Sequence, residues 1–305
     1  MILPFEHEIP IKAFNHHVSL LGGLLVDKSA IVAVYNNFVN LRLSTADYLY
    51  VYPTGYDRID LNYDIVLNIP TVFDFQRDSS LDKFIGVNRT LIDNGFYVDA
   101  YWDEFYVPEC SAYQKFPFRH NYVMYGYDNE FFYFAAYTRN RKPETIRLPY
   151  ETFYQAAERV ERTIYILRKY NRQYTYVLDP MQIVRGLDAY LEGRIDYCDT
   201  DTRPKAWKPK VLAGIDCIRF YMRLLEKRKA LSLDMRPMRS FLEHKQLMAD
   251  RIAHVYSSLN IEPAGDIEGL QLIASKMGIA FSLALKYQLT ENITILDRVH
   301  TFINV

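Results

Sequence analysis

The residue types with the clearest chemical potential lie in a 42-residue stretch from Phe96 to Tyr137, of which seventeen residues are aromatic. Its one histidine, His120, is the only histidine between His17 and His244. An imidazole exchanges protons near neutral pH and can therefore act as a general acid or base. His120 is the first candidate catalytic residue.

Two further histidines, His16 and His17, follow Asn15 at the start of a helix predicted over residues 15–25. The Asn15 side chain can cap the free amides of the first turn, and the helix macrodipole there disfavours imidazolium. If this turn faces His120, one imidazole could act as base and the other as acid, with Asn15 as a hydrogen-bond partner. The alternative is one core histidine and one solvated histidine. No metal site is predicted, because neighbouring helix residues point about 100° apart and no carboxylate pair accompanies them.

The loop between the first two predicted strands of this stretch is unusually aromatic, and such a loop either fills a core or lines a binding pocket. The side chains predicted to line a pocket for substrate are Trp102, Tyr106, Tyr113 and Phe118. Cys110, in the same loop, is either a second candidate nucleophile or a packed cysteine, and a loop thiol lacks an activating helix dipole. Asp103 and Glu104 could anchor a cationic group, but a solvated turn is the favoured interpretation.

The elements that must position these residues change in character near residue 150. Earlier segments alternate or form short apolar runs, with a hairpin turn at 126–129 and a Gly22–Gly23 pair that suggests close approach of another backbone. Later segments have helical spacing, beginning with a helix predicted from Pro149 to Leu167. We therefore predict an α+β domain over residues 1–148, with a helix packed on an antiparallel sheet, and an all-α module over residues 149–305.

Composition narrows the function classes. The formal net charge of −1 argues against a nucleic-acid partner, and no apolar run approaches the roughly 20 residues that span a bilayer. The N-terminal residues MILPFEHEIPIK do not read as a secretion signal. Three scattered cysteines suit a reducing compartment. We expect a cytoplasmic protein without a cofactor and make no prediction of its oligomeric state.

Two segments, NHHVSLLGGLL and RHNYVMYGYDNEFFYFAAY, resemble the N-terminal domain of butirosin-type acyltransferases, which belong to the papain-like cysteine-peptidase clan. The resemblance covers residues 10–150. It implies a cysteine opening the helix, a histidine opening a strand before a Gly-Tyr pair, and an acid on the next strand. His120 matches the family histidine, whereas His17, or His16 with a one-residue slip, occupies the cysteine position. The acid position falls near Ala136 or Tyr137, and neither side chain can orient an imidazole.

The segments IDNGFYVDAYWDEFYVPECSAYQKFPFRHNYVMYGYD and DMRPMRSFLEHKQLM also resemble uncharacterised proteins found beside nonribosomal peptide assembly lines. These resemblances imply natural-product biosynthesis, with an acyl- or peptidyl-carrier protein or a peptide-like small molecule as partner. Three hypotheses follow. The chain is an amide-forming acyltransferase or amidase with an altered histidine-based site, a catalytically inactive pseudoenzyme that binds such a partner, or a structural accessory protein of an assembly-line enzyme.

Overall fold

A computed structural model describes residues 1–44, 50–53, 63–69, 80–140, 142–160, 165–194, 211–226, 235–263 and 265–303. The protein is a mixed α+β chain with antiparallel sheets, so the predicted class is confirmed. Two compact units form, and neither is continuous in sequence. Unit 1 comprises Met1–Ala30 and Asp60–Thr175, and unit 2 comprises Ile31–Ile59 and Tyr176–Val305.

The centre of unit 1 is a six-stranded sheet in the order β3-β8-β4-β5-β6-β7, with every neighbouring pair antiparallel. Its strands are β3 (Tyr63–Ile69), β4 (Tyr97–Asp103), β5 (Arg119–Tyr127), β6 (Phe131–Tyr137), β7 (Pro143–Pro149) and β8 (Tyr165–Tyr170). The predicted hairpin joins β5 to β6. The Asp128 carboxylate closes its turn by accepting from the backbone amides of Glu130 and Phe131, both at 2.8 Å.

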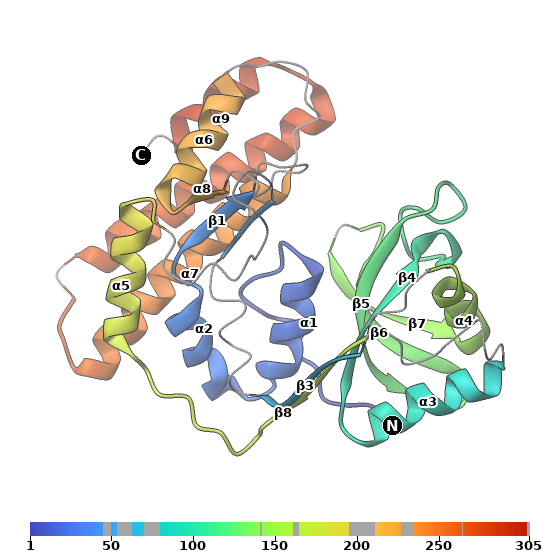
Figure 1. The fold of residues 1–305 in the computed structure, drawn as a ribbon. Helices are drawn as coiled ribbons and strands as arrows, with labels where there is room; N and C mark the ends of the chain where they lie inside the picture. The colour runs from blue at the N-terminus through green and yellow to red at the C-terminus, as the bar shows by residue number, and fades with distance from the viewer. Residues whose placement is uncertain are drawn as a thin grey trace, which may run out of the picture. The chain divides into compact units, whose positions relative to one another are not determined.

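Helices cover both faces of this sheet (Figure 1): α1 (Asn15–Leu24) lies on one face, and α3 (Leu81–Asp93) and α4 (Tyr150–Glu158) lie on the other. The hydroxyl of Tyr170 in β8 donates to the Leu20 carbonyl of α1 at 2.6 Å. A Cβ on Gly23 would overlap the Tyr170 ring, and one on Gly22 would overlap the Phe5 ring. The glycine pair therefore admits aromatic rings, not the backbone that the sequence suggested.

The α3–α4 face carries the main core of unit 1. Trp102 is fully buried, with its ring centroid 4.4 Å from that of Phe134 and 5.7 Å from that of Phe153 in α4. Helix α3 begins after Ser80, whose side chain accepts from the Lys83 amide at the first turn.

Unit 2 combines helices with a small antiparallel sheet in the order β2-β1-β9. Its strands are β1 (Leu41–Ser44), β2 (Tyr50–Pro53) and β9 (Val211–Ala213). Its helices are α2 (Ile31–Asn37), α5 (Pro180–Leu191), α6 (Ile215–Glu226), α7 (Met235–Leu259), α8 (Asp266–Thr290) and α9 (Thr294–Ile303). Helix α7 packs against α8, and α8 against α9. Within the described part of the chain, α8 alone has the length and apolar composition that could span a membrane.

The predicted division at residue 148 therefore differs from the two units. The helix expected to continue to Leu167 ends at Glu158, and Tyr165–Tyr170 instead forms β8 of the unit 1 sheet. Strand β9 likewise lies within the stretch expected to be all α. Tertiary pairing overrides the local period here, because a central sheet position satisfies the backbone of β8 on both edges.

A buried polar contact secures the end of α2 in unit 2. His244 and Arg251, both on α7, are fully buried. His244 Nε2 donates to the Val39 carbonyl at 2.8 Å, and Arg251 donates to the carbonyls of Tyr35 at 2.7 Å and Phe38 at 2.6 Å. These carbonyls lie at and just beyond the last turn of α2, where backbone acceptors have no intrahelical partner and cations are favoured.

Candidate active site

Strand register determines which face of the sheet carries His120. His120 pairs with Trp102, whose ring packs against α4, and residues paired across neighbouring strands share a face. The next residue, Asn121, points to the opposite face and donates to Asp99 at 2.7 Å. His120 therefore lies on the α4 face of the sheet.

Helix α1 lies on the face opposite His120. Asp99 pairs with Arg168 at 3.0 Å, and Tyr170, two residues further along β8, shares that face and donates to α1. The sheet thus separates His120 from the helix that was expected to supply its catalytic partner.

The partner of His120 is instead a buried carboxylate. Glu104 lies in a 3-10 turn, η3 (Glu104–Tyr106), and its Oε1 is 3.0 Å from His120 Nδ1. The Tyr122 hydroxyl donates to the same oxygen. The Glu104 side chain is 7% exposed and the His120 side chain 36% exposed, so the carboxylate is shielded while part of the imidazole reaches solvent.

This geometry assigns a tautomer to His120. A carboxylate only accepts hydrogen bonds, so Nδ1 carries the proton that it shares with Glu104. The remaining nitrogen, Nε2, then has a lone pair in the neutral ring. A carboxylate that accepts from Nδ1–H, with the lone pair on Nε2, is the arrangement of a histidine general base.

Asp103 holds the turn that delivers Glu104. Its carboxylate accepts from the amides of Phe105 at 3.0 Å and Phe118 at 2.9 Å, and the Glu104 amide donates to the Phe118 carbonyl at 2.8 Å. The first of these hydrogen bonds closes the turn, and the other two connect the end of β4 to Phe118, just before β5. Glu104 is consequently fixed beside His120.

The favoured interpretation of Asp103 and Glu104 as a solvated turn is wrong, because both residues are buried. The resemblance placed the orienting acid after His120, near Ala136 or Tyr137. The acid beside His120 is instead Glu104, which lies sixteen residues before His120 in the chain. The available signal was a carboxylate pair inside an almost wholly aromatic segment, YWDEFY, where apolar neighbours favour burial.

Cys110 lies behind this network. Its side chain is fully buried, with Sγ 3.9 Å from the Tyr137 carbonyl oxygen. Burial, reinforced by the negative charge of Glu104, raises the pKa of the Cys110 thiol to about 12. The thiol is therefore protonated at neutral pH, and a catalytic thiolate at Cys110 is ruled out.

Of the four aromatic residues predicted to bind substrate, Phe118 lies at the site. Its ring centroid is 5.3 Å from that of His120, and the side chain is exposed. Phe116, also exposed, lies 6.3 Å from Phe118 and extends the same apolar surface.

The other three aromatic residues predicted to bind substrate pack against the core or against neighbouring side chains. Trp102 is fully buried in the core, which corrects its assignment to a pocket wall. Tyr106 is partly buried against the same core. Tyr113 accepts from Gln114 at 3.1 Å and lies under the Arg139 guanidinium.

His17 of α1 does not meet His120. His17 is fully buried, with an edge-to-face contact to Phe14 at 5.8 Å between ring centroids. Because α1 lies on the other face of the sheet, His17 and His120 do not form an acid–base pair, and that prediction is wrong. The side chains of Asn15 and His16 lie outside the described residues, although both residues belong to α1.

Across the described ranges, no group of three or more His, Cys, Asp or Glu side chains could hold a metal ion. The sequence matches no protein-family model and no curated protein.

Proposed function

We propose that this chain is an acyl-transfer enzyme of specialised metabolism, forming or cleaving amides, in which His120 is the general base. The observation that carries the proposal is the 3.0 Å contact between His120 Nδ1 and the buried Glu104 carboxylate. Tyr122 donates to the same carboxylate and restrains it from the other side. The site thus has a partly exposed imidazole with a buried carboxylate behind it.

Each group has a defined part in the proposed reaction. His120 Nε2 takes a proton from an attacking amine or water as the new bond to the acyl carbon forms. The proton then passes to the leaving thiol or amine as its bond to that carbon breaks. Glu104 stabilises the imidazolium that exists between these two transfers. A positioned base of this kind contributes roughly 10²- to 10⁴-fold in rate.

The proposal requires no covalent acyl-enzyme intermediate. Cys110 is excluded by its burial, and His17 is on the wrong face of the sheet. A helix packed on an antiparallel sheet supports the papain-like resemblance at the level of architecture. The position of His120 departs from it, because the family histidine faces the helix that bears the thiol. We therefore infer direct transfer between two bound substrates, or onto water.

The substrate setting rests on the resemblance to proteins of nonribosomal peptide assembly. The exposed rings of Phe116 and Phe118 beside His120 suit an acyl chain or peptide-like group presented by a carrier protein. A cytoplasmic location belongs to the same proposal.

The test is steady-state kinetics with acyl-carrier thioesters, a panel of amines and the corresponding amides, with products identified by mass spectrometry. We expect His120→Ala to lower kcat/KM by 10²- to 10⁴-fold. Glu104→Gln keeps the side-chain shape but removes the charge, so we expect kcat to fall about 10- to 100-fold with KM nearly unchanged. His254→Ala, in unit 2, is the matched control and should match wild type. Full activity of His120→Ala would refute the proposal.

A second candidate is a catalytically inactive protein that binds an acyl or peptidyl carrier. The exposed Phe116 and Phe118 favour it, because such a surface binds ligand whether or not His120 reacts. If the wild-type chain turns over no substrate, binding of the acylated carrier should persist in His120→Ala and be lost in Phe118→Ala. Titration calorimetry distinguishes these outcomes.

A further inference from the structure

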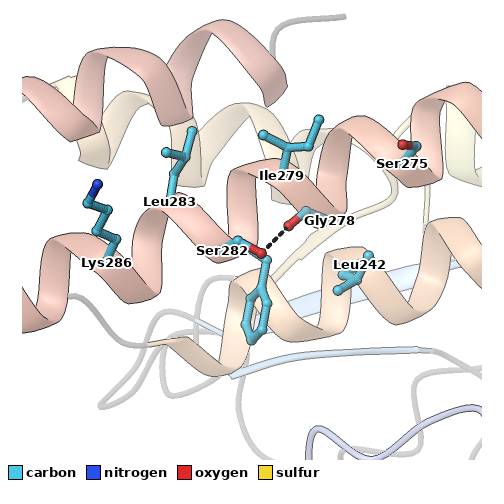
Figure 2. Close-up of a pocket in the computed structure, with 8 residues that line it drawn as sticks. Leu242, Ser275, Gly278, Ile279, Ser282, Leu283 and Lys286 are labelled. Atoms are coloured by element: carbon cyan, nitrogen blue, oxygen red, sulfur yellow. Dashed lines mark hydrogen bonds between the residues drawn. The ribbon is translucent and has the colours of Figure 1, made fainter.

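Helix α8 in unit 2 exposes a face with a regular seven-residue repeat. Ser275, Ile279, Ser282 and Lys286 line a groove of about 590 Å³ beside Leu242 of α7 (Figure 2). Successive exposed positions along this face alternate four and three residues apart, which is the spacing of a coiled-coil seam. We call these residues the α8 seam: Glu268, Leu272, Ser275, Ile279, Ser282, Lys286 and Leu289.

The seam lies opposite the face that α8 uses within unit 2. The buried residues of α8 are Ala274, Met277, Ala280 and Ala284. On the seam, Leu289 is 86%, Leu272 54% and Ile279 42% exposed. Three large apolar side chains on one helix face are thus in solvent, at the positions where a coiled-coil partner would contact them.

The charges on the seam indicate what that partner is. Glu268 lies near the start of α8 and Lys286 near its end, about 27 Å apart at 1.5 Å per residue. When two α8 helices run antiparallel about a two-fold axis near Ile279, Glu268 of each copy lies within one turn of Lys286 of the other. A parallel pair would instead place like charges opposite each other. The seam is therefore complementary to itself in one orientation.

The small residues of the seam fit the same axis. Ser275 of one copy lies opposite Ser282 of the other, so the two backbones can approach closely at the centre. Gly278 borders the groove there, and a Cβ at this position would come no closer than 3.8 Å to Leu242. We propose that a second copy of this chain docks antiparallel on the α8 seam and forms a two-fold dimer.

One helix pair buries less than the roughly 800 Å² per partner of a standard interface, so the dimer should exchange with monomer. Sedimentation equilibrium of the full chain should show a mass that rises toward twice the monomer mass between about 1 and 200 µM. We expect Ile279→Glu to weaken association at least tenfold. Leu191→Glu, at an exposed leucine of α5, is the matched control and should leave association unchanged.

The charge pairs allow a sharper test. Glu268→Lys and Lys286→Glu each place like charges together at both ends of the seam, so each should weaken association several-fold. The double variant reverses both pairs and should restore wild-type association. Raising the salt concentration should reduce the difference between single and double variants. Circular dichroism of each variant confirms that α8 remains folded.

Three results would overturn the proposal. One is a monomeric wild-type chain over the whole concentration range. Another is a dimer that is unaffected by Ile279→Glu or is not restored by the double charge reversal. The third is a monomer that binds phosphatidylcholine vesicles through Leu289 and Ile279, because the occupant of the seam would then be a lipid surface.

Discussion

Two histidines in this protein show how burial decides the chemistry of one residue type. His120 shares a proton with a carboxylate through Nδ1 and keeps part of its ring in solvent. His244 is fully enclosed and uses Nε2 to hold a backbone carbonyl. A partly exposed imidazole with an acid behind it can exchange protons during a reaction. A sealed imidazole bound to a carbonyl contributes only to stability.

The two buried thiols, Cys110 and Cys217, should react slowly with alkylating reagents. Burial raises the pKa of both Cys110 and Cys217 to about 12. The thiolate is the reactive form, so we expect native alkylation by iodoacetamide at pH 8 to be roughly a thousandfold slower than in the unfolded chain. Peptide mass spectrometry after timed labelling, with the protein in guanidinium as control, measures both sites. Rapid native labelling of Cys110 would contradict the buried placement.

His244 should make stability depend on pH. Burial, with the positive charge of Lys245 next, holds the pKa of His244 well below 6.5. Below about pH 6.5, His244 binds a proton in the unfolded chain but stays neutral in the folded chain. The free energy of unfolding should therefore fall by about 1.4 kcal/mol per pH unit from this residue, and recover above that pH.

His244→Gln isolates that effect. Glutamine retains a side-chain N–H that can donate to the Val39 carbonyl but does not titrate. Urea unfolding of both proteins between pH 5 and 8 should show a shallower acid dependence in the variant, because every other ionisable group is common to both proteins. Parallel pH dependences would show that the pKa of His244 does not differ between the folded and unfolded chain.

At the scale of elements, the position of α1 depends on two glycines that leave room for the rings of Phe5 and Tyr170. Ala has a helix propensity about 1 kcal/mol better than Gly, yet a methyl group on Gly23 would overlap the Tyr170 ring. Overpacking of this kind costs about 1–3 kcal/mol. We expect Gly23→Ala to lower the free energy of unfolding, measured by urea denaturation.

Gly86 in α3 is the matched control for Gly23. A Cβ there meets nothing within 4 Å, so Gly86→Ala should raise the free energy of unfolding by about 0.5–1 kcal/mol. Stabilisation by both substitutions would mean that α1 does not pack on Tyr170 as described.

At the scale of the whole molecule, both units contain an early and a late segment of the chain. Strand β8, from the second half of the sequence, lies between β3 and β4. A fragment of residues 1–148 lacks β8 and α4, which removes both the strand between β3 and β4 and the Phe153 contact to Trp102. We expect this fragment to unfold without cooperativity and to be digested readily.

A fragment ending at residue 175 provides the comparison for 1–148. It contains all of unit 1, and we expect it to regain cooperative thermal unfolding, monitored by circular dichroism. Cooperative unfolding of both fragments would contradict the requirement for β8.

Local pattern was sufficient for several elements and for His120. The turn at 126–129 predicted the β5–β6 hairpin, and it is confirmed because it depends on residues close in sequence. His120 also lies at the start of a strand, β5, as the resemblance implied. Sequence therefore determined the α+β class and the first residue of the site.

Only the tertiary structure decided what faces His120. The register of β4 and β5 places His120 on the face covered by α4 and Asn121 on the face covered by α1. A shift of one residue would exchange the two faces. The burial of Glu104 depended on a turn held by Asp103 and on the core around Trp102, all of which form only when distant strands pair. Spacing along a chain specifies neither the register of a sheet nor the burial of a carboxylate, because both depend on contacts between segments that are remote in sequence.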